Sequence, residues 1–208
     1  MHRIVRCASF AVAAFTIPGF VLGGEAFPID ARHSTIGFSI GIAGGLTKVD
    51  GAFESFQGEV DYDREDLSKS RVSITIDAAS VDTGVAGRDA HLRDTDFFDA
   101  PKFPTITFQS KSIEREDDRH VLVGPLTMHG VTRTVRIPFR RMHAQPVVTL
   151  FGTPSIVFEG SVKLKRANFG IAGTSRWNSL IEATGEMAMS DEVEIHLRII
   201  GHQPAPRK

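Results

Sequence analysis

The sequence predicts an all-β protein of about eight or nine antiparallel strands with one short helix between strands. Three observations predict this class. Apolar residues fall on every second position in many short segments, polar or Gly/Pro-rich clusters separate these segments, and one stretch has helical spacing. The length of 208 residues suits a single domain.

The clearest strand is predicted over residues 34–42. Ile36, Phe38, Ile40 and Ile42 alternate there with small or polar residues, which is the period of a strand buried on one face. Other segments repeat this period: 72–76, 106–108, 121–123, 135–139 and 193–199. Three more strands are predicted from weaker patterns: 53–62, 147–151 and 156–164.

Turn chemistry separates the predicted strands. Residues 43–45, 63–66, 116–119 and 152–154 form polar or Gly/Pro-rich clusters of the length that joins antiparallel neighbours. One helix is predicted over residues 86–98, because Pro101 disfavours its continuation. Such strands must stack as two sheets or close into a barrel, since open edges invite association. Periodicity alone does not choose between the two.

Residues 1–26 are typical of a secretory signal peptide. Arg3 and Arg6 precede an uncharged apolar run, and small residues follow it. The run is too short and too interrupted to be a convincing membrane span. We expect cleavage after Ala26, with an earlier cut near Gly23 as the alternative, and a periplasmic domain of residues 27–208. The only cysteine, Cys7, lies in the leader, so no disulfide is expected.

Charge and aromatic composition indicate which kinds of molecule the protein could bind. Removing Arg3, Arg6 and Glu25 changes the formal net charge from −1 to −2, so no electrostatic footprint for nucleic acid remains. No basic amphipathic helix is predicted, which favours transient rather than permanent membrane contact. The chain has 15 phenylalanines but one Trp and one Tyr, a balance that favours rings without polar groups.

Several motifs, spread in order over nearly the whole mature chain, resemble the YceI family. The central ones are Arg88-Asp89-Ala90-His91-Leu92, followed by Asp96-Phe97-Phe98-Asp99. The others lie at residues 29–38, 49–53, 56–58, 103–108, 126–132, 166–171 and 190–195. No single motif is diagnostic, but their order is.

The resemblance implies a lipocalin-like β-barrel with an elongated apolar tunnel. It also implies non-enzymatic binding, storage or transport of a long isoprenoid lipid, such as a polyprenyl phosphate or a prenylated quinone like ubiquinone. No cofactor beyond that lipid is implied, and a homodimer is consistent with it. Two alternatives stay open: a stress-response or interaction module with a filled barrel, and an enzyme of isoprenoid or quinone metabolism.

The alternation and the motifs select candidate site residues. The candidates for the apolar tunnel are Ile36, Phe38, Ile40, Ile74, Phe108, Leu126 and Phe169. The candidates for binding a head group are His33, Arg88, His91 and Arg166. Arginine offers a planar fork of donors to phosphate oxygens. The structural alternative is that Arg88 and Asp89 brace the helix and that His33 and Ser34 satisfy backbone groups at the first strand.

No catalytic or metal site is predicted. Asp30, His33 and Ser34 have the residue types of a hydrolase triad, but neighbours on a strand point to opposite faces. The histidines are isolated along the sequence, and none forms the close pair with a carboxylate that is typical of zinc sites. Basic and apolar residues alternate over 162–166, which predicts an exposed charged face that includes Arg166.

Overall fold

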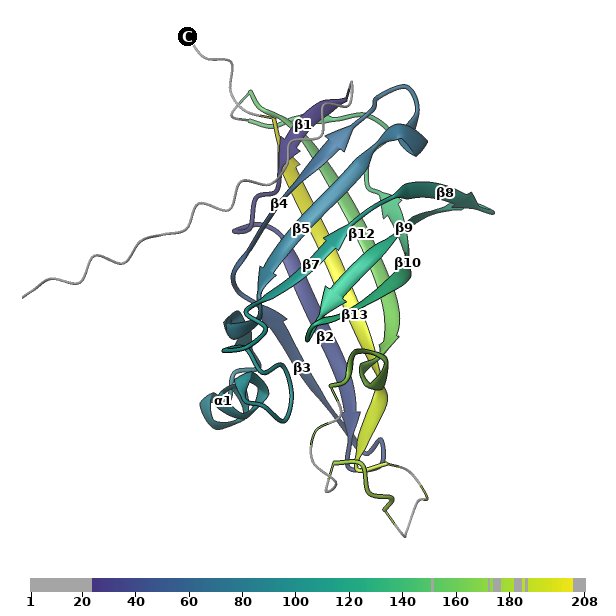
Figure 1. Ribbon diagram of the computed structural model, residues 1–208. Helices are drawn as coiled ribbons and strands as arrows, with labels where there is room; N and C mark the ends of the chain where they lie inside the picture. The colour runs from purple at the N-terminus through teal and green to yellow at the C-terminus, as the bar shows by residue number, and fades with distance from the viewer. Residues whose placement is uncertain are drawn as a thin grey trace, which may run out of the picture.

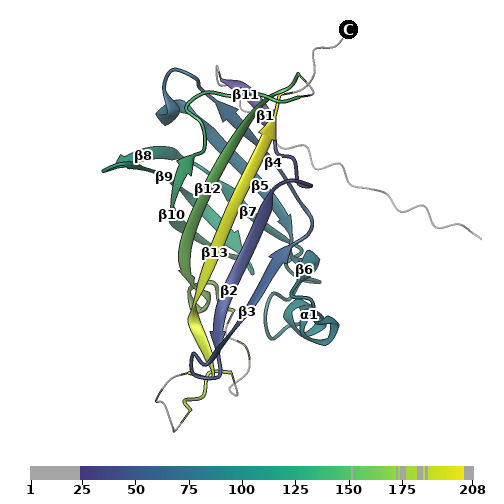
Figure 2. The same ribbon diagram turned by 180° about the vertical axis from the view of Figure 1, so that it is seen from behind.

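The computed structural model describes residues 24–150, 152–171, 173, 177–181, 185 and 187–203. Thirteen strands in this part of the chain form one antiparallel sheet that curls around an interior (Figures 1 and 2). The strands are β1 (Glu25–Pro28), β2 (Thr35–Ile42), β3 (Thr47–Phe53), β4 (Phe56–Tyr62), β5 (Arg71–Asp77), β6 (Val81–Asp82), β7 (Thr105–Gln109), β8 (Ser112–Glu116), β9 (Arg119–Met128), β10 (Val131–Arg141), β11 (Val147–Val148), β12 (Pro154–Lys165) and β13 (Met189–His202).

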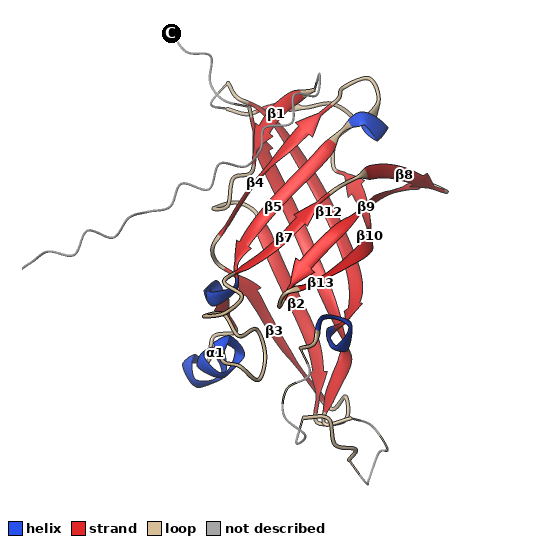
Figure 3. Cartoon of the chain, in the orientation of Figure 1, coloured by secondary structure: helices blue, strands red, loops and turns tan. Residues whose placement is uncertain are grey.

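Helical structure is limited to short segments (Figure 3). The helix α1 spans Ala86–Arg93, and three 3₁₀ turns are η1 (Leu67–Lys69), η2 (Ala78–Ser80) and η3 (Arg166–Phe169). No helix among the described residues is both long and apolar enough to cross a bilayer.

The sheet follows the order β1-β4-β5-β7-β9-β10-β12-β13-β2-β3-β6. The segment after β1 connects the β1 edge of the sheet to β13. In this segment the Ile29 N–H donates to the Gly58 carbonyl of β4, and the Asp30 N–H donates to the Ile200 carbonyl of β13. We call this junction the seam. It lies at the end of the barrel that carries β1, and α1 lies at the opposite end (Figure 1).

The inward face of the strands lines the barrel interior with apolar side chains. Phe38, Phe53, Phe108 and Ile137 are all buried, as are most of the alternating residues that predicted the strands. Phe27 of β1 and Tyr62 of β4 form a separate cluster at the β1 end, with their rings edge to face at 5.8 Å. Burial of this apolar surface is the main stabilising contribution to the fold.

The predicted fold class is confirmed, with more strands than expected. Four strands were not predicted: β1, β3, β6 and β8. The segment predicted as one strand over 53–62 is divided, because β3 ends at Phe53 and β4 begins at Phe56. The strand predicted over 147–151 is only β11, and residue 151 lies outside the described residues.

The helix is shorter than predicted. It ends at Arg93 rather than continuing to residue 98. The Asp94 side chain accepts a hydrogen bond from the Thr95 N–H, and the Asp94 carbonyl accepts from the N–H groups of Phe97 and Asp99. Asp side chains compete in this way with helical hydrogen bonds, so the chain turns instead.

The predicted leader falls mostly outside the described residues. Glu25 and Ala26, its last two residues, belong to β1 and pair with Tyr62 and Asp61 of β4. Arg64 donates to the Glu25 carboxylate at 2.7 Å, and Gln203 does so at 2.8 Å. These two residues are therefore part of the folded domain.

Candidate ligand-binding cavity

A cavity of about 420 Å³ occupies the α1 end of the barrel. All of its lining residues except Arg88, His91 and Arg166 are apolar. The apolar walls are formed by Phe38, Ile40, Ile42, Val49, Phe53, Leu92, Phe97, Phe98, Met128, Leu164, Ile171, Trp177, Met189, Val193 and Ile195. Its volume lies in the range of about 300–1,000 Å³ that is typical of ligand sites in proteins.

Strands β2 and β13 together supply one apolar wall of the cavity. Strands β2 and β13 are antiparallel neighbours, and their register sets Phe38 opposite Ile195 and Ile40 opposite Val193. Side chains that are opposite each other in a sheet project from the same face, so all four reach the interior together. Next to them, Leu164 of β12 is paired with Val193 and extends the apolar wall.

Helix α1 is fixed against the barrel by side-chain hydrogen bonds to the segment that precedes it. The Asp89 carboxylate accepts from both the backbone N–H and the hydroxyl of Thr83, which follows β6. These hydrogen bonds hold the pKa of Asp89 below its usual value, although burial opposes the shift. Arg93 donates to the carbonyl groups of Ala79 and Val81. The helix is thereby positioned with Arg88, His91 and Leu92 at the cavity.

The two polar residues of α1 differ in what they already bind. Arg88 donates to the hydroxyl of Thr83 at 2.7 Å and to its carbonyl at 2.9 Å. No carboxylate among the described residues forms an ion pair with Arg88. His91, in contrast, is paired with Asp96 at 3.0 Å, and its ring stands edge to face against Phe97 at 5.0 Å. Arg88 is therefore the more available donor for an anion.

Arg166 is buried, which corrects the sequence prediction for that residue, whereas Lys163 and Lys165 lie on an exposed face as predicted. Only 5% of Arg166 is exposed, whereas the side chain of Lys163 is 63% exposed. The guanidinium of Arg166 donates to the carbonyl groups of Ile171, Ser190 and Met189 and to the side chain of Asn178. Burial lowers its pKa, but a guanidinium still remains charged.

The β1 half of the barrel interior is more tightly filled. A second apolar space there measures about 60 Å³ and is lined by residues that include Ile74, Phe108 and Leu197. Leu126 and Leu197 each pack against both of the larger core clusters. The large and the small space share no lining residue, so the interior holds two separate spaces rather than a continuous tunnel.

The structure distributes the predicted tunnel residues over these regions. Phe38 and Ile40 line the large cavity, whereas Ile74 and Phe108 line the small one. Ile36 borders a mostly polar surface hollow beside residues 31–35. Leu126 and Phe169 belong to the packed core and border none of these spaces.

The predicted head-group residues are also divided. Arg88, His91 and Arg166 come together at the large cavity. His33 does not, because it lies at the seam, where its Nδ1 is 2.6 Å from the Asp30 carboxylate. The structure therefore does not bring His33 to the large cavity with the other three candidates. His33 and Asp30 also lie beside His202, so these histidines are not isolated in space.

Most of the cavity wall was not named from the sequence. Val193 and Ile195 alternate as clearly as Phe38 and Ile40 do, so periodicity could have found them. Phe97, Phe98 and Trp177 lie outside regular strands, and no periodic signal marks them.

Comparison with known proteins supports a family assignment. The family model for a YceI-like domain matches residues 27–200. A UPF0312 protein of Vibrio vulnificus (strain YJ016) is 33% identical over 163 residues, which cover 76% of this chain and 85% of the relative. Protein YceI of Salmonella agona (strain SL483) is 32% identical over 163 residues, covering 78% and 84%.

Solved structures share the same architecture. Burkholderia cenocepacia BcnA matches with a TM-score of 0.69 and 25% identity, over 83% of this chain and 98% of BcnA. The Campylobacter jejuni YceI protein matches with a TM-score of 0.64 and 26% identity, over 77% and 88%. A polyisoprenoid binding domain from Saccharophagus degradans, at 18% identity and a TM-score of 0.63 over 86% and 98%, shares the fold. With the curled sheet, the central helix and the apolar cavity in place, the chain belongs to the YceI-like family.

Proposed function

We propose that this protein holds an isoprenoid lipid, a polyprenyl phosphate or a prenylated quinone, and stores or carries it without chemical change. The observation that supports this most is the cavity at the α1 end, whose walls are apolar except for Arg88, His91 and Arg166. An isoprenoid tail has no hydrogen-bonding group, so it needs such walls. Its polar head needs the few donors that α1 and η3 supply. That a protein of the same fold is a polyisoprenoid binding domain is consistent with this role.

The energetics of lipid exchange fit an enclosed apolar cavity. Each buried methylene contributes about 0.8 kcal/mol relative to water. For a tail of many isoprene units, this sum would exceed the limit of about −18 to −21 kcal/mol for non-covalent binding. The relevant reference is therefore the bilayer, where the tail is already buried. A carrier must nearly match the bilayer, and apolar walls without unpaired polar groups allow this.

The cations at the cavity fit an anionic or strongly hydrogen-bonding head group. No carboxylate among the described residues forms an ion pair with Arg88, so the charge of its guanidinium is not neutralised there. The side chain is also partly exposed on α1. A phosphate could accept paired hydrogen bonds from its guanidinium. A quinone oxygen would accept a single weaker one. The arrangement accordingly favours a phosphate over a quinone at this position.

A long tail needs more room than the large cavity supplies. We propose that the tail enters at the α1 end and displaces the side chains between the two cavities, so that Ile74 and Phe108 join the wall. Leu126 and Leu197, which pack against both core clusters, are the residues that would have to move. A change of side-chain rotamer leaves the backbone hydrogen bonds of the sheet intact, so such an adjustment does not require unfolding.

We propose that the α1 end of the barrel makes transient contact with the membrane, because two exposed leucines lie beside the cavity there. Leu46, in the turn between β2 and β3, is 83% exposed, and Leu180 is 67% exposed. The Ala43 N–H of this turn donates to the Ala188 carbonyl, and the Ala188 N–H donates to the Ser179 carbonyl, so the two segments adjoin. Both flank cavity residues, Ile42 on one segment and Trp177 on the other. Insertion of these leucines would bring the cavity to the lipid.

We further propose export to the periplasm with a cut before Gly24 or Glu25 rather than after Ala26. Cleavage after Ala26 would remove half of β1 and both hydrogen bonds to the Glu25 carboxylate. The mass of the mature protein recovered from a periplasmic extract tests this proposal directly.

The binding proposal is tested by native mass spectrometry of protein mixed with a polyprenyl phosphate or with ubiquinone. We expect one lipid per barrel, and the same spectra show whether the protein is a monomer or a homodimer. Leu164→Trp should weaken the adduct, because the larger indole would take up part of the cavity that the tail needs. The matched control is Lys163→Trp, whose side chain lies on the exposed face of the same strand.

The same experiment separates the competing functions. A wild-type protein that stays lipid-free after incubation would favour an interaction module with a filled barrel. Conversion of the added lipid to a product would favour an enzyme.

A further inference from the structure

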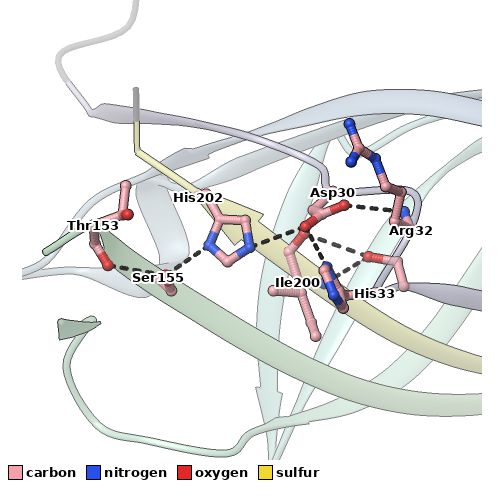
Figure 4. Close-up of polar contacts among 8 residues, drawn as sticks. Asp30, Arg32, His33, Thr153, Ser155, Ile200 and His202 are labelled. Atoms are coloured by element: carbon pink, nitrogen blue, oxygen red, sulfur yellow. Dashed lines mark hydrogen bonds and ion pairs between the residues drawn. The ribbon is translucent and has the colours of Figure 1, made fainter. Parts of the chain in front are cut away.

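We propose that Asp30, His33 and His202 form a binding site for a divalent transition metal ion at the seam of the barrel. Figure 4 shows the three side chains converging, with the two imidazole rings directed at the Asp30 carboxylate. His33 Nδ1 lies 2.6 Å and His202 Nε2 lies 3.1 Å from the same oxygen, Asp30 Oδ2. This site is separate from the cavity at the α1 end, and it goes beyond the proposed lipid-binding function.

The ligand set and its spacing fit zinc. The three ligand atoms all lie within 4.8 Å of one another. In a tetrahedral site with bonds of about 2.0–2.2 Å, ligand atoms lie about 3.3–3.6 Å apart. His202 Nε2 would therefore need to move away from Asp30 Oδ2 by about 0.2–0.5 Å, and His33 Nδ1, on an exposed side chain, by about 0.7–1.0 Å. Two imidazoles and one carboxylate leave one position for water, and imidazole suits zinc, nickel and copper.

A chain of hydrogen bonds behind His202 can set the tautomer that a metal needs. His202 Nδ1 lies 2.7 Å from the Ser155 hydroxyl, and that hydroxyl can donate to the Thr153 carbonyl at 3.1 Å. When the hydroxyl donates to the Thr153 carbonyl, it accepts a hydrogen bond from the N–H at His202 Nδ1. A neutral ring then presents a lone pair at Nε2, toward Asp30. Such partners behind a histidine ligand are typical of metal sites.

The carboxylate and the backbone around it are also held in place. The Arg32 N–H donates to Asp30 Oδ1 at 3.0 Å, which leaves Oδ2 directed at the two rings. The guanidinium of Arg32 points away from the cluster (Figure 4). The Asp30 N–H is bonded to the Ile200 carbonyl, and the Ile200 N–H to the Ser34 hydroxyl at 2.9 Å. The ligands on the turn after β1 are thus fixed relative to the end of β13.

The site is open to solvent on one side. The side chain of His33 is 69% exposed, that of His202 is 35% exposed and that of Asp30 is 20% exposed. An ion can therefore enter past His33, while His202 and Asp30 provide the more enclosed ligands. A bound metal would link the turn after β1 to the last turn of β13 and so brace the seam.

The buried hydroxyl next to His202 does not form a nucleophile in this arrangement. Ser155 is only 6% exposed, and in this arrangement its hydroxyl donates to the Thr153 carbonyl and accepts from His202 Nδ1. Ser155, His202 and Asp30 therefore have the residue types of a hydrolase triad without an accessible hydroxyl. Orientation of a metal ligand is the role that this geometry supports.

The test uses the untagged full chain, first treated with a chelator and then titrated with ZnCl₂ while the melting temperature is recorded. At free zinc about a hundredfold above Kd, we expect the melting temperature to rise by about 5–10 °C. His33→Gln and His202→Gln should each remove most of that rise. The matched control is His196→Gln on β13, whose only ion-pair partner among the described residues is Glu194 at 3.9 Å. This variant should respond like the wild type.

Titration with CoCl₂ gives a second readout, because tetrahedral Co²⁺ with nitrogen and oxygen ligands absorbs visible light. We expect absorption bands in the wild type and in His196→Gln, and none in His202→Gln. An unchanged melting temperature in the wild type would overturn the proposal, because the cluster would then be a hydrogen-bonded latch only. An equal rise in all four proteins would also overturn it, since zinc would then bind elsewhere.

Discussion

The guanidinium of Arg166 donates a hydrogen bond to the carbonyl oxygen of Ile171 at 3.1 Å, and both residues line the same cavity. Arg166 also donates to the Ser190 carbonyl at 2.9 Å. One buried side chain thus joins the segment after η3 to the start of β13. This arrangement gives Arg166 a structural role in addition to any contact with a lipid head.

Replacement of Arg166 should therefore lower stability. We expect Arg166→Met to reduce the free energy of unfolding by about 2–4 kcal/mol, because buried carbonyl groups lose their donor. Urea unfolding followed by circular dichroism measures this difference. The exposed neighbour provides the control, since Lys165→Met should change stability by no more than about 0.5 kcal/mol. Equal stability of the two variants would contradict the structural role.

Arg88 should contribute to the affinity for an anionic head group. We expect Arg88→Gln to weaken binding of a polyprenyl phosphate by about 10- to 100-fold, the usual effect of losing a charged hydrogen bond. Binding of the corresponding uncharged prenyl alcohol should change little. Fluorescence titration of both lipids measures the two effects. Arg119→Gln, at the exposed start of β9, is the control, and an equal loss for both lipids would argue against a role in head-group binding.

Leu126 should limit the length of tail that the barrel accepts. Leu126→Ala should open a connection between the two cavities, at a cost of about 2–5 kcal/mol in stability. We expect the variant to gain affinity for a long prenyl alcohol such as solanesol relative to a short one such as farnesol. Competition binding measures this ratio. An unchanged ratio would mean that the tail does not extend into the β1 half.

The two exposed leucines should speed the uptake of lipid from membranes. The double variant Leu46→Glu, Leu180→Glu places two charges at the α1 end, so transfer of lipid from liposomes should slow by at least about tenfold, because the charges disfavour insertion. Affinity for lipid presented in detergent should remain. Val148→Glu is the control, because Val148 is similarly exposed, at 65%, but lies on β11, away from the cavity. If that variant transfers lipid equally slowly, the contact is not specific to the α1 end.

The parts of the fold that followed from the sequence are those with a periodic pattern. β2 and β13 alternate cleanly in sequence, because apolar side chains such as Phe38 and Ile195 lie on the face that lines the barrel interior. The hairpin between β9 and β10 turns at His129-Gly130, with φ of 51° and 72° at the two positions, as a two-residue hairpin turn requires. In contrast, β8 was missed because its sequence is mostly charged and only Ile113 is buried.

The site was harder to predict than the fold, for a physical reason. Alternation shows which residues share a face, but it does not show how far along the barrel axis each one lies. Phe38 and Phe108 therefore seemed equivalent, although one lines the large cavity and the other the small one. The seam cluster joins residues 30 and 202, a pairing that depends on the closure of the sheet and has no local signal.

His120 should make stability fall as the solution becomes acidic. Its ring lies 5.7 Å from that of Phe139, and burial, together with the charges of Arg141 and Arg115, lowers its pKa. The unfolded chain, with an ordinary histidine pKa of about 6.5, therefore binds more protons than the folded one below that pH. The contribution of neutral His120 to stability is present above pH 6.5 and is lost as the pH falls from there toward the lower folded pKa.

His120→Phe removes this proton uptake and keeps an aromatic ring beside Phe139. The decrease in melting temperature between pH 7 and pH 5 should therefore be smaller in the variant than in the wild type. Differential scanning calorimetry across that range measures the two slopes, and the other histidines contribute equally to both proteins. His143→Phe, at an exposed position after β10, should keep the wild-type slope. A parallel slope in His120→Phe would mean that the folded protein accommodates the protonated ring without cost.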